Sequence, residues 1–131
     1  MSEAEEYGQV IRVIRQDEVS TDTPQTEGIT RLAAIASNTV GARKLWFGLF
    51  KNYPGANSGR HHHGEAETAA YIAKGRFRVY YGDNFEQFVE LGPGDCVFIP
   101  PYLPHIEVNE GPGEAEGVLA RSPDNIVVPL E

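Results

Sequence analysis

Short apolar segments recur from residue 44 onward, and residues that favour turns follow each of them. The segments are KLWFGLF, AAYIA, RFRVYY, EQFVEL and CVFIP, followed in order by KNYPGANSG, KG, GDN, GPGD and PYLPH. Apolar runs of this length with such boundaries are typical of β-strands, and their spacing is typical of antiparallel sandwiches and barrels. No segment shows the longer period of an amphipathic helix. The pattern therefore predicts an all-β fold of short antiparallel strands.

Strand alternation also indicates where side chains point. In the segment HIEVN, side chains two residues apart lie on the same face of a strand. His105, Glu107 and Asn109 therefore share one face, which is polar and which we expect to carry function. Ile106 and Val108 share the other face, which we expect to pack in the core.

The first forty residues are more polar than the rest of the chain. Within them, VIRVIR (10–15) alternates as an edge strand would, and STDTPQTEG (20–28) is rich in turn-forming residues. A chain of 131 residues falls within the usual size of one domain. We therefore predict a single domain, residues 1–131, with an N-terminal arm and edge strand over 1–40 and a barrel core over 41–131.

Charge and composition narrow the classes of partner. Eleven Lys and Arg against nineteen Asp and Glu give a formal charge of -8, which opposes binding to nucleic acid or to anionic membranes. The chain has no apolar run of about 20 residues and no secretory signal, so we expect a cytoplasmic protein. The single cysteine, Cys96, excludes an internal disulfide, and we expect it to be a small core residue.

The four histidines occupy only two places in the chain. Three are adjacent, His61, His62 and His63, and the fourth is His105. On a strand, His61 and His63 project to one face while His62 points away. Neutral imidazole is a common ligand for divalent first-row metals, so His61, His63 and His105 are the candidate ligands of a metal site.

The first histidine group resembles a motif of the cupin superfamily, which is a family of small double-stranded β-helix, or jelly-roll, barrels. The motif has a Gly, five residues, His-x-His, three or four residues, a Glu, six residues and a Gly. Here these positions correspond to Gly55, His61, His63, Glu67 and Gly75. The resemblance implies metal ligation by the two histidines and by the carboxylate.

The segment around His105 resembles the second cupin motif. That motif has a Gly, five residues, Pro-x-Gly, two residues, His, three residues and Asn. Here Gly94, Pro100, His105 and Asn109 match it, while Tyr102 replaces the second Gly. The two motifs and the link between them span residues 55–109, so the resemblance implies a small single-domain cupin with His105 as a ligand.

The position of the carboxylate departs from the first motif by one residue. Seven residues separate Glu67 from Gly75, so a count back from Gly75 places Thr68 in the carboxylate position. A shift of one residue on a strand reverses the face. Either a bulge returns Glu67 to the site, or three histidines hold the metal alone. Glu65 and Glu107 are possible substitutes or supporting partners.

A mononuclear site of this kind keeps coordination positions open for a substrate. Cupins with such sites include dioxygenases, isomerases, lyases and decarboxylases that use Fe, Mn, Ni, Zn or Cu. The resemblance thus implies one divalent transition metal and an enzyme acting on a small organic molecule, with a dioxygenase-type reaction as the first hypothesis. Glu107 or Tyr71 would assist as a base or as an orienting group.

A second hypothesis is a non-catalytic cupin that binds or senses a small molecule, with a structural metal or none. Turnover on a panel of substrates separates the two hypotheses.

The resemblance to small cupins also implies a homodimer, in which VIRVIR pairs with the edge of a partner's sheet.

Overall fold

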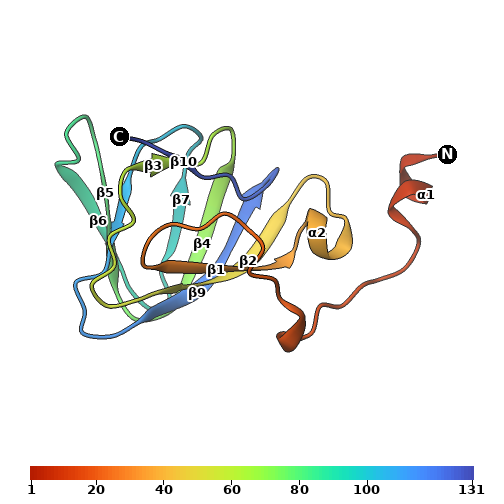
Figure 1. The fold of residues 1–131 in the computed structure, drawn as a ribbon, viewed down its shortest axis with the longest axis horizontal. Helices are drawn as coiled ribbons and strands as arrows, with labels where there is room; N and C mark the ends of the chain where they lie inside the picture. Colours follow the sequence, from red (N-terminus) through yellow and green to blue (C-terminus); the bar gives the residue numbers. More distant parts are fainter.

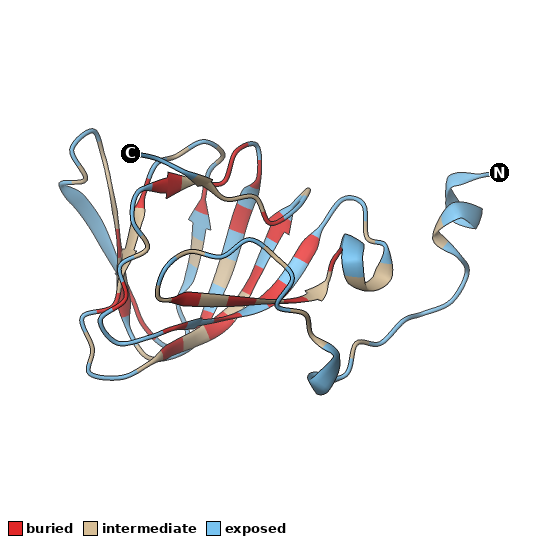
Figure 2. Ribbon diagram, in the orientation of Figure 1, coloured by how far each residue is buried: buried red, intermediate tan, exposed pale blue.

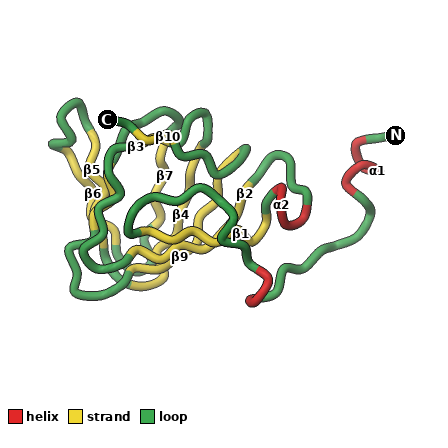
Figure 3. Tube along the Cα trace, in the orientation of Figure 1, coloured by secondary structure: helices red, strands yellow, loops and turns green.

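The computed structural model describes all residues 1–131 and consists mainly of antiparallel strands (Figures 1 and 3). The ten strands are β1 Ile29–Ile35, β2 Trp46–Asn52, β3 His61–His62, β4 Glu67–Lys74, β5 Phe77–Tyr81, β6 Gln87–Leu91, β7 Cys96–Ile99, β8 Ile106–Val108, β9 Ala115–Ser122 and β10 Val128–Pro129. The helices are α1 Glu3–Tyr7, the 3-10 helix η1 Gln16–Glu18 and α2 Ser37–Val40. None of the helices has the length and apolar character needed to span a membrane.

The strands form two layers that enclose a lumen. One layer is a five-stranded sheet in the order β1-β2-β9-β4-β7. The other contains a three-stranded sheet, β6-β5-β8, and the pair β10-β3. Backbone bridges from Asn57 to Val108 and from His61 to His105 connect this pair with β8. The arrangement is a double-stranded β-helix, as the sequence predicts, and it brings both histidine segments together.

Alternation along the strands supplies the core. In β2, the side chains of Trp46, Phe50 and Asn52 are buried, whereas Phe47 and Leu49 point outward. Figure 2 shows the same alternation of buried and exposed positions along the neighbouring strands. The apolar cluster consists of Ala33, Ala36, Trp46, Phe50, Ile72, Phe77, Val79, Leu91, Ala115 and Leu119.

The five apolar segments from residue 44 onward are confirmed as β2, β4, β5, β6 and β7. The N-terminal prediction is wrong in two respects. VIRVIR forms no strand, because no other segment pairs with its backbone, and Val10 and Ile11 are exposed in an arm that extends away from the barrel (Figure 1). The barrel also begins earlier than residue 41, since β1 pairs with β2 from Ile29 onward. The homodimer stays a prediction.

Two predictions about which side chains are buried are also wrong. In HIEVN, the polar side chains of His105 and Asn109 are the buried ones, while Ile106 and Val108 are half-exposed. The inner face of this strand is therefore polar, because it lines the lumen. Cys96 is exposed on the outer face of β7 and is not a core residue.

A stability prediction follows from the packing of β9 against β2. A Cβ atom on Gly117 would clash with the carbonyl oxygen of Tyr71 and lie 2.7 Å from a ring carbon of Phe50. We expect Gly117→Ala to lower the free energy of unfolding by roughly 1–3 kcal/mol, because an overpacked core must shift. Urea unfolding measures this change. Gly113→Ala is the control, since its Cβ would meet no atom within 4 Å, and equal stability of both variants would contradict the packing.

Candidate metal centre

Backbone pairing brings the two histidine segments into contact. The N–H of His61 donates to the carbonyl of His105 at 3.2 Å, and the N–H of His105 donates to the carbonyl of His61 at 2.9 Å. His63 follows two residues after His61 and turns to the same side. The three rings are nearly inaccessible to solvent, with residue exposures of 0–1%. The fold therefore collects these side chains from both motifs at one buried point.

The three rings form a compact triangle. Their centroids lie 4.4 Å apart for His61 and His105, and 4.9 Å apart for each of the other two pairs. One potential ligand nitrogen from each ring lies within 4.8 Å of the other two. These separations leave space for one ion between the rings.

Backbone carbonyls select the same tautomer in all three rings. The Nδ1 atom of His61 lies 3.0 Å from the Gly59 oxygen, that of His63 lies 2.7 Å from the Ile126 oxygen, and that of His105 lies 2.8 Å from the Leu103 oxygen. A carbonyl oxygen can only accept, so each Nδ1 carries the proton and each Nε2 presents a lone pair. Such outer hydrogen bonds are typical of histidines that ligate metals.

The Nε2 atoms of His61 and His105 are buried and have no hydrogen-bond partner. A buried polar atom without a partner costs free energy, so it needs a bound group to accept its lone pair. A divalent cation satisfies this need directly. The residues present thus fit a metal ion bound through three imidazole nitrogens.

Burial also keeps these rings in the neutral form that a metal requires. Burial lowers the pKa of His61 to about 4, with neighbouring charges contributing less. The pKa values of His63 and His105 are likewise lowered, mainly by burial. At neutral pH the three lone pairs are therefore available without loss of a proton.

His62 differs from its neighbours, as the strand alternation predicts. It is half-buried, and its Nδ1 accepts a hydrogen bond of 2.9 Å from the backbone N–H of Gly64. When neutral, its proton is therefore on Nε2, the opposite tautomer to that of the other three rings. His62 does not belong to the cluster.

Glu67, the predicted fourth ligand, lies on the outer face of β4 and is exposed, whereas Thr68 is buried and points inward. A bulge does occur in β4, but it falls between Ile72 and Lys74 and leaves Glu67 outside. Glu65 is also exposed. The prediction that Glu67 ligates is therefore wrong, and the count that placed Thr68 in the carboxylate position is correct.

The two predicted catalytic residues lie on strands of different sheets, Tyr71 on β4 and Glu107 on β8, and only Glu107 points into the lumen. Tyr71 is 45% exposed on the outer face of β4, so its predicted role as a base is wrong. Glu107 points into the lumen beside the guanidinium of Arg31, with 3.6 Å between Nη2 and Oε2. Burial acts most strongly on the pKa of Glu107 and raises it, but the charge of Arg31 and smaller contributions from His105, His61 and Arg121 together outweigh burial, so the pKa is lowered. Glu107 is therefore an ionised carboxylate inside the barrel.

Arg121 contacts the histidine cluster directly and is not among the site residues predicted from the sequence. Its Nη2 lies 3.0 Å from Nε2 of His63, its Nε donates to Thr68 Oγ1 at 2.9 Å, and its Nη1 donates to Asn125 Oδ1 at 2.7 Å. Burial lowers its pKa to about 9, so it remains cationic at neutral pH. The signal in the sequence is a charged residue at an inward position of β9, a strand that was not predicted.

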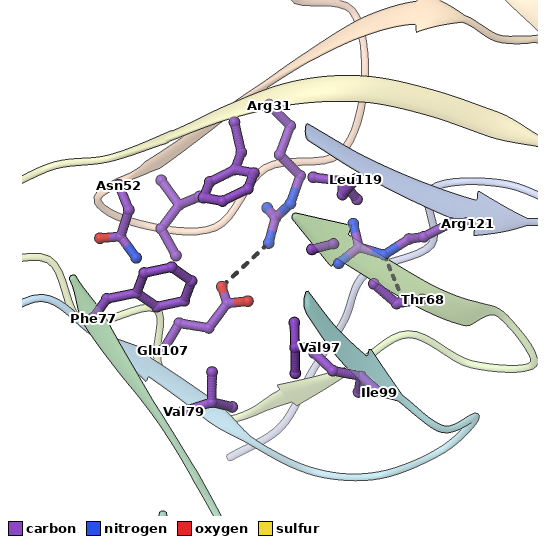
Figure 4. Close-up of a pocket in the computed structure, with 13 residues that line it drawn as sticks. Arg31, Asn52, Thr68, Phe77, Val79, Val97, Ile99, Glu107, Leu119 and Arg121 are labelled. Carbon is purple, nitrogen blue, oxygen red and sulfur yellow. Dashed lines mark hydrogen bonds and ion pairs between the residues drawn. The ribbon is translucent and has the colours of Figure 1, made fainter. Parts of the chain in front are cut away.

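Arg121 and Glu107 line a small cavity (Figure 4), and Arg121 connects it with the cluster through its contact with His63. Its charged residues are Arg31, Glu107 and Arg121, and most of its other walls are apolar. The centre of a water molecule can move within about 30 Å³ of it, so only a ligand of a few heavy atoms fits unless the walls move. The cavity combines a few charged and polar groups with mostly apolar walls, as small-molecule sites commonly do.

A family model described as a cupin domain matches residues 48–120, more than half of the chain. The chain belongs to the cupin family. A search of curated proteins found no match. This cupin resembles the polyketide cyclase RemF from Streptomyces resistomycificus, with a TM-score of 0.75 and 21% identity over 93% of this chain and 87% of RemF.

Other solved structures share the fold at similar identity. An uncharacterised double-stranded β-helix protein from Klebsiella pneumoniae has a TM-score of 0.67 and 20% identity over 93% of this chain and 99% of its own. KdgF from Halomonas sp. has a TM-score of 0.64 and 23% identity over 86% of this chain and 94% of its own. Identities this low show the shared fold.

The geometry predicts which substitutions abolish metal uptake. We expect wild-type protein to carry one transition-metal ion per chain, and His105→Ala to lose it, because two imidazoles bind far more weakly than three. Elemental analysis of dialysed protein gives the stoichiometry. Glu67→Ala is the control and should retain the ion, since Glu67 is outside the barrel. Loss of metal in Glu67→Ala would contradict the assigned ligand set.

The lowered histidine pKa values predict acid destabilisation of the metal-free protein. The unfolded chain protonates His61 near its ordinary pKa of 6.5, whereas the folded protein does so only near pH 4. The unfolded state thus binds more protons between these values, and stability falls as the pH drops from 6.5 to 4. His61 alone contributes a loss of roughly 3 kcal/mol.

Urea unfolding of chelator-treated protein at pH 7, 6, 5 and 4 measures this loss. His61→Gln, which has no titrating ring, should show a shallower dependence on pH between 6.5 and 5. Stability that stays constant from pH 7 to pH 5 in the wild type would show that the buried histidines are not held neutral.

Proposed function

We propose that this cupin is a mononuclear metalloenzyme that acts on a small organic molecule, with His61, His63 and His105 holding one divalent transition metal. The observation that carries the proposal is the convergence of three Nε2 lone pairs, two of which have no partner. Three neutral imidazoles suit Fe, Mn, Ni, Zn or Cu. When bound, such a metal polarises a substrate oxygen and, if redox-active, supports dioxygen chemistry.

Glu107 is the residue best placed to move a proton. Its carboxylate is ionised and lies inside the lumen, on the same strand face as His105. Its Oε2 pairs with Arg31 only at 3.6 Å, too far for a hydrogen bond, and has no hydrogen-bond donor. A carboxylate with a free lone pair beside a substrate cavity can accept a proton and return it. Arg31 keeps this carboxylate ionised and in position.

These features favour a proton-transfer reaction, of the isomerase or lyase type, on a substrate with an acidic C–H bond next to a carbonyl. Proteins of similar fold include a polyketide cyclase, a predicted oxalate decarboxylase from Thermotoga maritima and a putative sugar phosphate isomerase from Acidithiobacillus ferrooxidans. Their range supports an enzymatic role and does not select one substrate.

A dioxygenase-type reaction is the second candidate, and one observation favours it. Thr68 occupies the position of the motif's carboxylate, so the protein offers three ligands and leaves more of the metal's coordination sphere open. A non-catalytic binding protein would use the same site without turnover.

Deuterium exchange separates these functions. We expect the metal-loaded protein in D2O to exchange the C–H protons of small keto acids and 1,3-dicarbonyl compounds, followed by NMR, without consuming oxygen. Glu107→Gln should slow the exchange by about 10²–10⁴-fold, because it removes the base, while metal content is unchanged. Glu67→Gln is the control and should exchange at the wild-type rate.

Oxygen consumption in the same samples, measured with an oxygen electrode, would favour the dioxygenase-type reaction. Saturable binding with neither exchange nor oxygen uptake would contradict the enzymatic proposal.

A further inference from the structure

Two arginines lie buried next to the histidine cluster, and only one carboxylate accompanies them. Arg31 and Arg121 are 1% and 3% exposed, and Glu107 is the sole acidic residue of the cavity. With neutral histidines, two guanidinium charges and one carboxylate leave one net positive charge in the lumen. A divalent metal adds two more. An excess of buried charge is costly unless an opposite charge accompanies it.

No protein group supplies the missing negative charge. The carboxylate of the family motif is absent from the lumen, because Thr68 stands there and accepts a hydrogen bond from Arg121. Glu67 and Glu65, the acidic residues nearest to Thr68 in the sequence, are exposed on the outside of the barrel. The balancing anion must therefore come from a bound molecule.

Arg121 has one donor that metal binding would free. Its Nη2 approaches Nε2 of His63 at 3.0 Å, and that lone pair cannot accept an N–H and bind a metal together. Thr68 and Asn125 hold the other nitrogens of the guanidinium. When His63 ligates, the guanidinium stays anchored at the mouth of the metal site with an unsatisfied donor directed at the cluster.

We propose that the lumen binds a small carboxylate-bearing substrate, with Arg121 as the residue that recognises its carboxylate next to the metal. Charge-assisted hydrogen bonds from a guanidinium to a carboxylate are among the strongest that side chains form. Apolar residues that line the same cavity, among them Val97, Ile99 and Leu119, would contact a short carbon chain (Figure 4). This inference rests on the proposed metal site and narrows its substrate to organic anions of a few heavy atoms.

Calorimetry with malonate and its neutral analogue malonamide tests the proposal. We expect zinc-loaded wild-type protein to bind malonate at least tenfold more tightly than malonamide, and more tightly than the metal-free protein does. Arg121→Gln should lose at least tenfold in malonate affinity while malonamide binding is unchanged. The same variant should bind zinc as tightly as the wild type or more tightly, because a competing donor and a repelling charge are gone.

Arg15→Gln, in the exposed N-terminal arm, is the matched control and should bind malonate normally. If Arg121→Gln does not fold, Arg121→Lys and the wild-type comparison of the two ligands still decide the question. Two outcomes would overturn the inference but leave the metal site intact. In the first, zinc-loaded wild-type protein binds malonate and malonamide with equal affinity. In the second, Arg121→Gln binds zinc and keeps the full malonate affinity. A wild type that takes up no zinc overturns the metal site and this inference together.

Discussion

Three hydrogen bonds from histidine Nδ1–H groups to backbone carbonyls fix the orientation and the tautomer of the histidine rings in this lumen. The acceptors are the carbonyl groups of Gly59, Ile126 and Leu103, which belong to loops beside β3, β10 and β8. Since these carbonyls are part of the main chain, the fold itself orients the rings and places every Nδ1 proton. The remaining lone pairs therefore converge in a buried interior, where burial keeps the imidazoles neutral. The capacity of this site to bind a metal therefore depends on the positions of these backbone carbonyls as well as on the histidines.

The two ends of the lumen differ in the polarity of the side chains that line them. Toward Phe50 and Phe77 it is mostly apolar, with the two rings in edge contact at 5.9 Å and the buried amide of Asn52 beside Phe77 (Figure 4). Toward the histidines it contains buried charges that would destabilise an empty core, and Arg121 meets part of the cost by bonding to His63. Polar groups retained at such a cost support the proposal that a metal and an anion complete the site.

Much of the fold was predictable because local patterns agree with the final structure. β2 and β4 through β7 have clear apolar runs between turns, and the spacing of the histidines placed them on one face. β1 and β9 escaped prediction because Arg31, Gly117 and Arg121 interrupt their apolar inward faces. Whether Glu67 or Thr68 points into the lumen could not be predicted, because it depends on the register in which β4 pairs with β9. Arg121 reaches His63 across 58 residues of sequence, a contact that no local pattern encodes.

The most direct measurement of the central claim is a long-range ¹⁵N–¹H correlation spectrum of the histidine rings in metal-free protein at neutral pH. We predict the Nδ1–H tautomer for His61, His63 and His105, and the Nε2–H tautomer for neutral His62. One equivalent of zinc should then shift the Nε2 resonances of the three buried rings and leave His62 unchanged. Protonated or mixed tautomers in the three rings, or a zinc response at His62 instead, would contradict a preorganised metal centre.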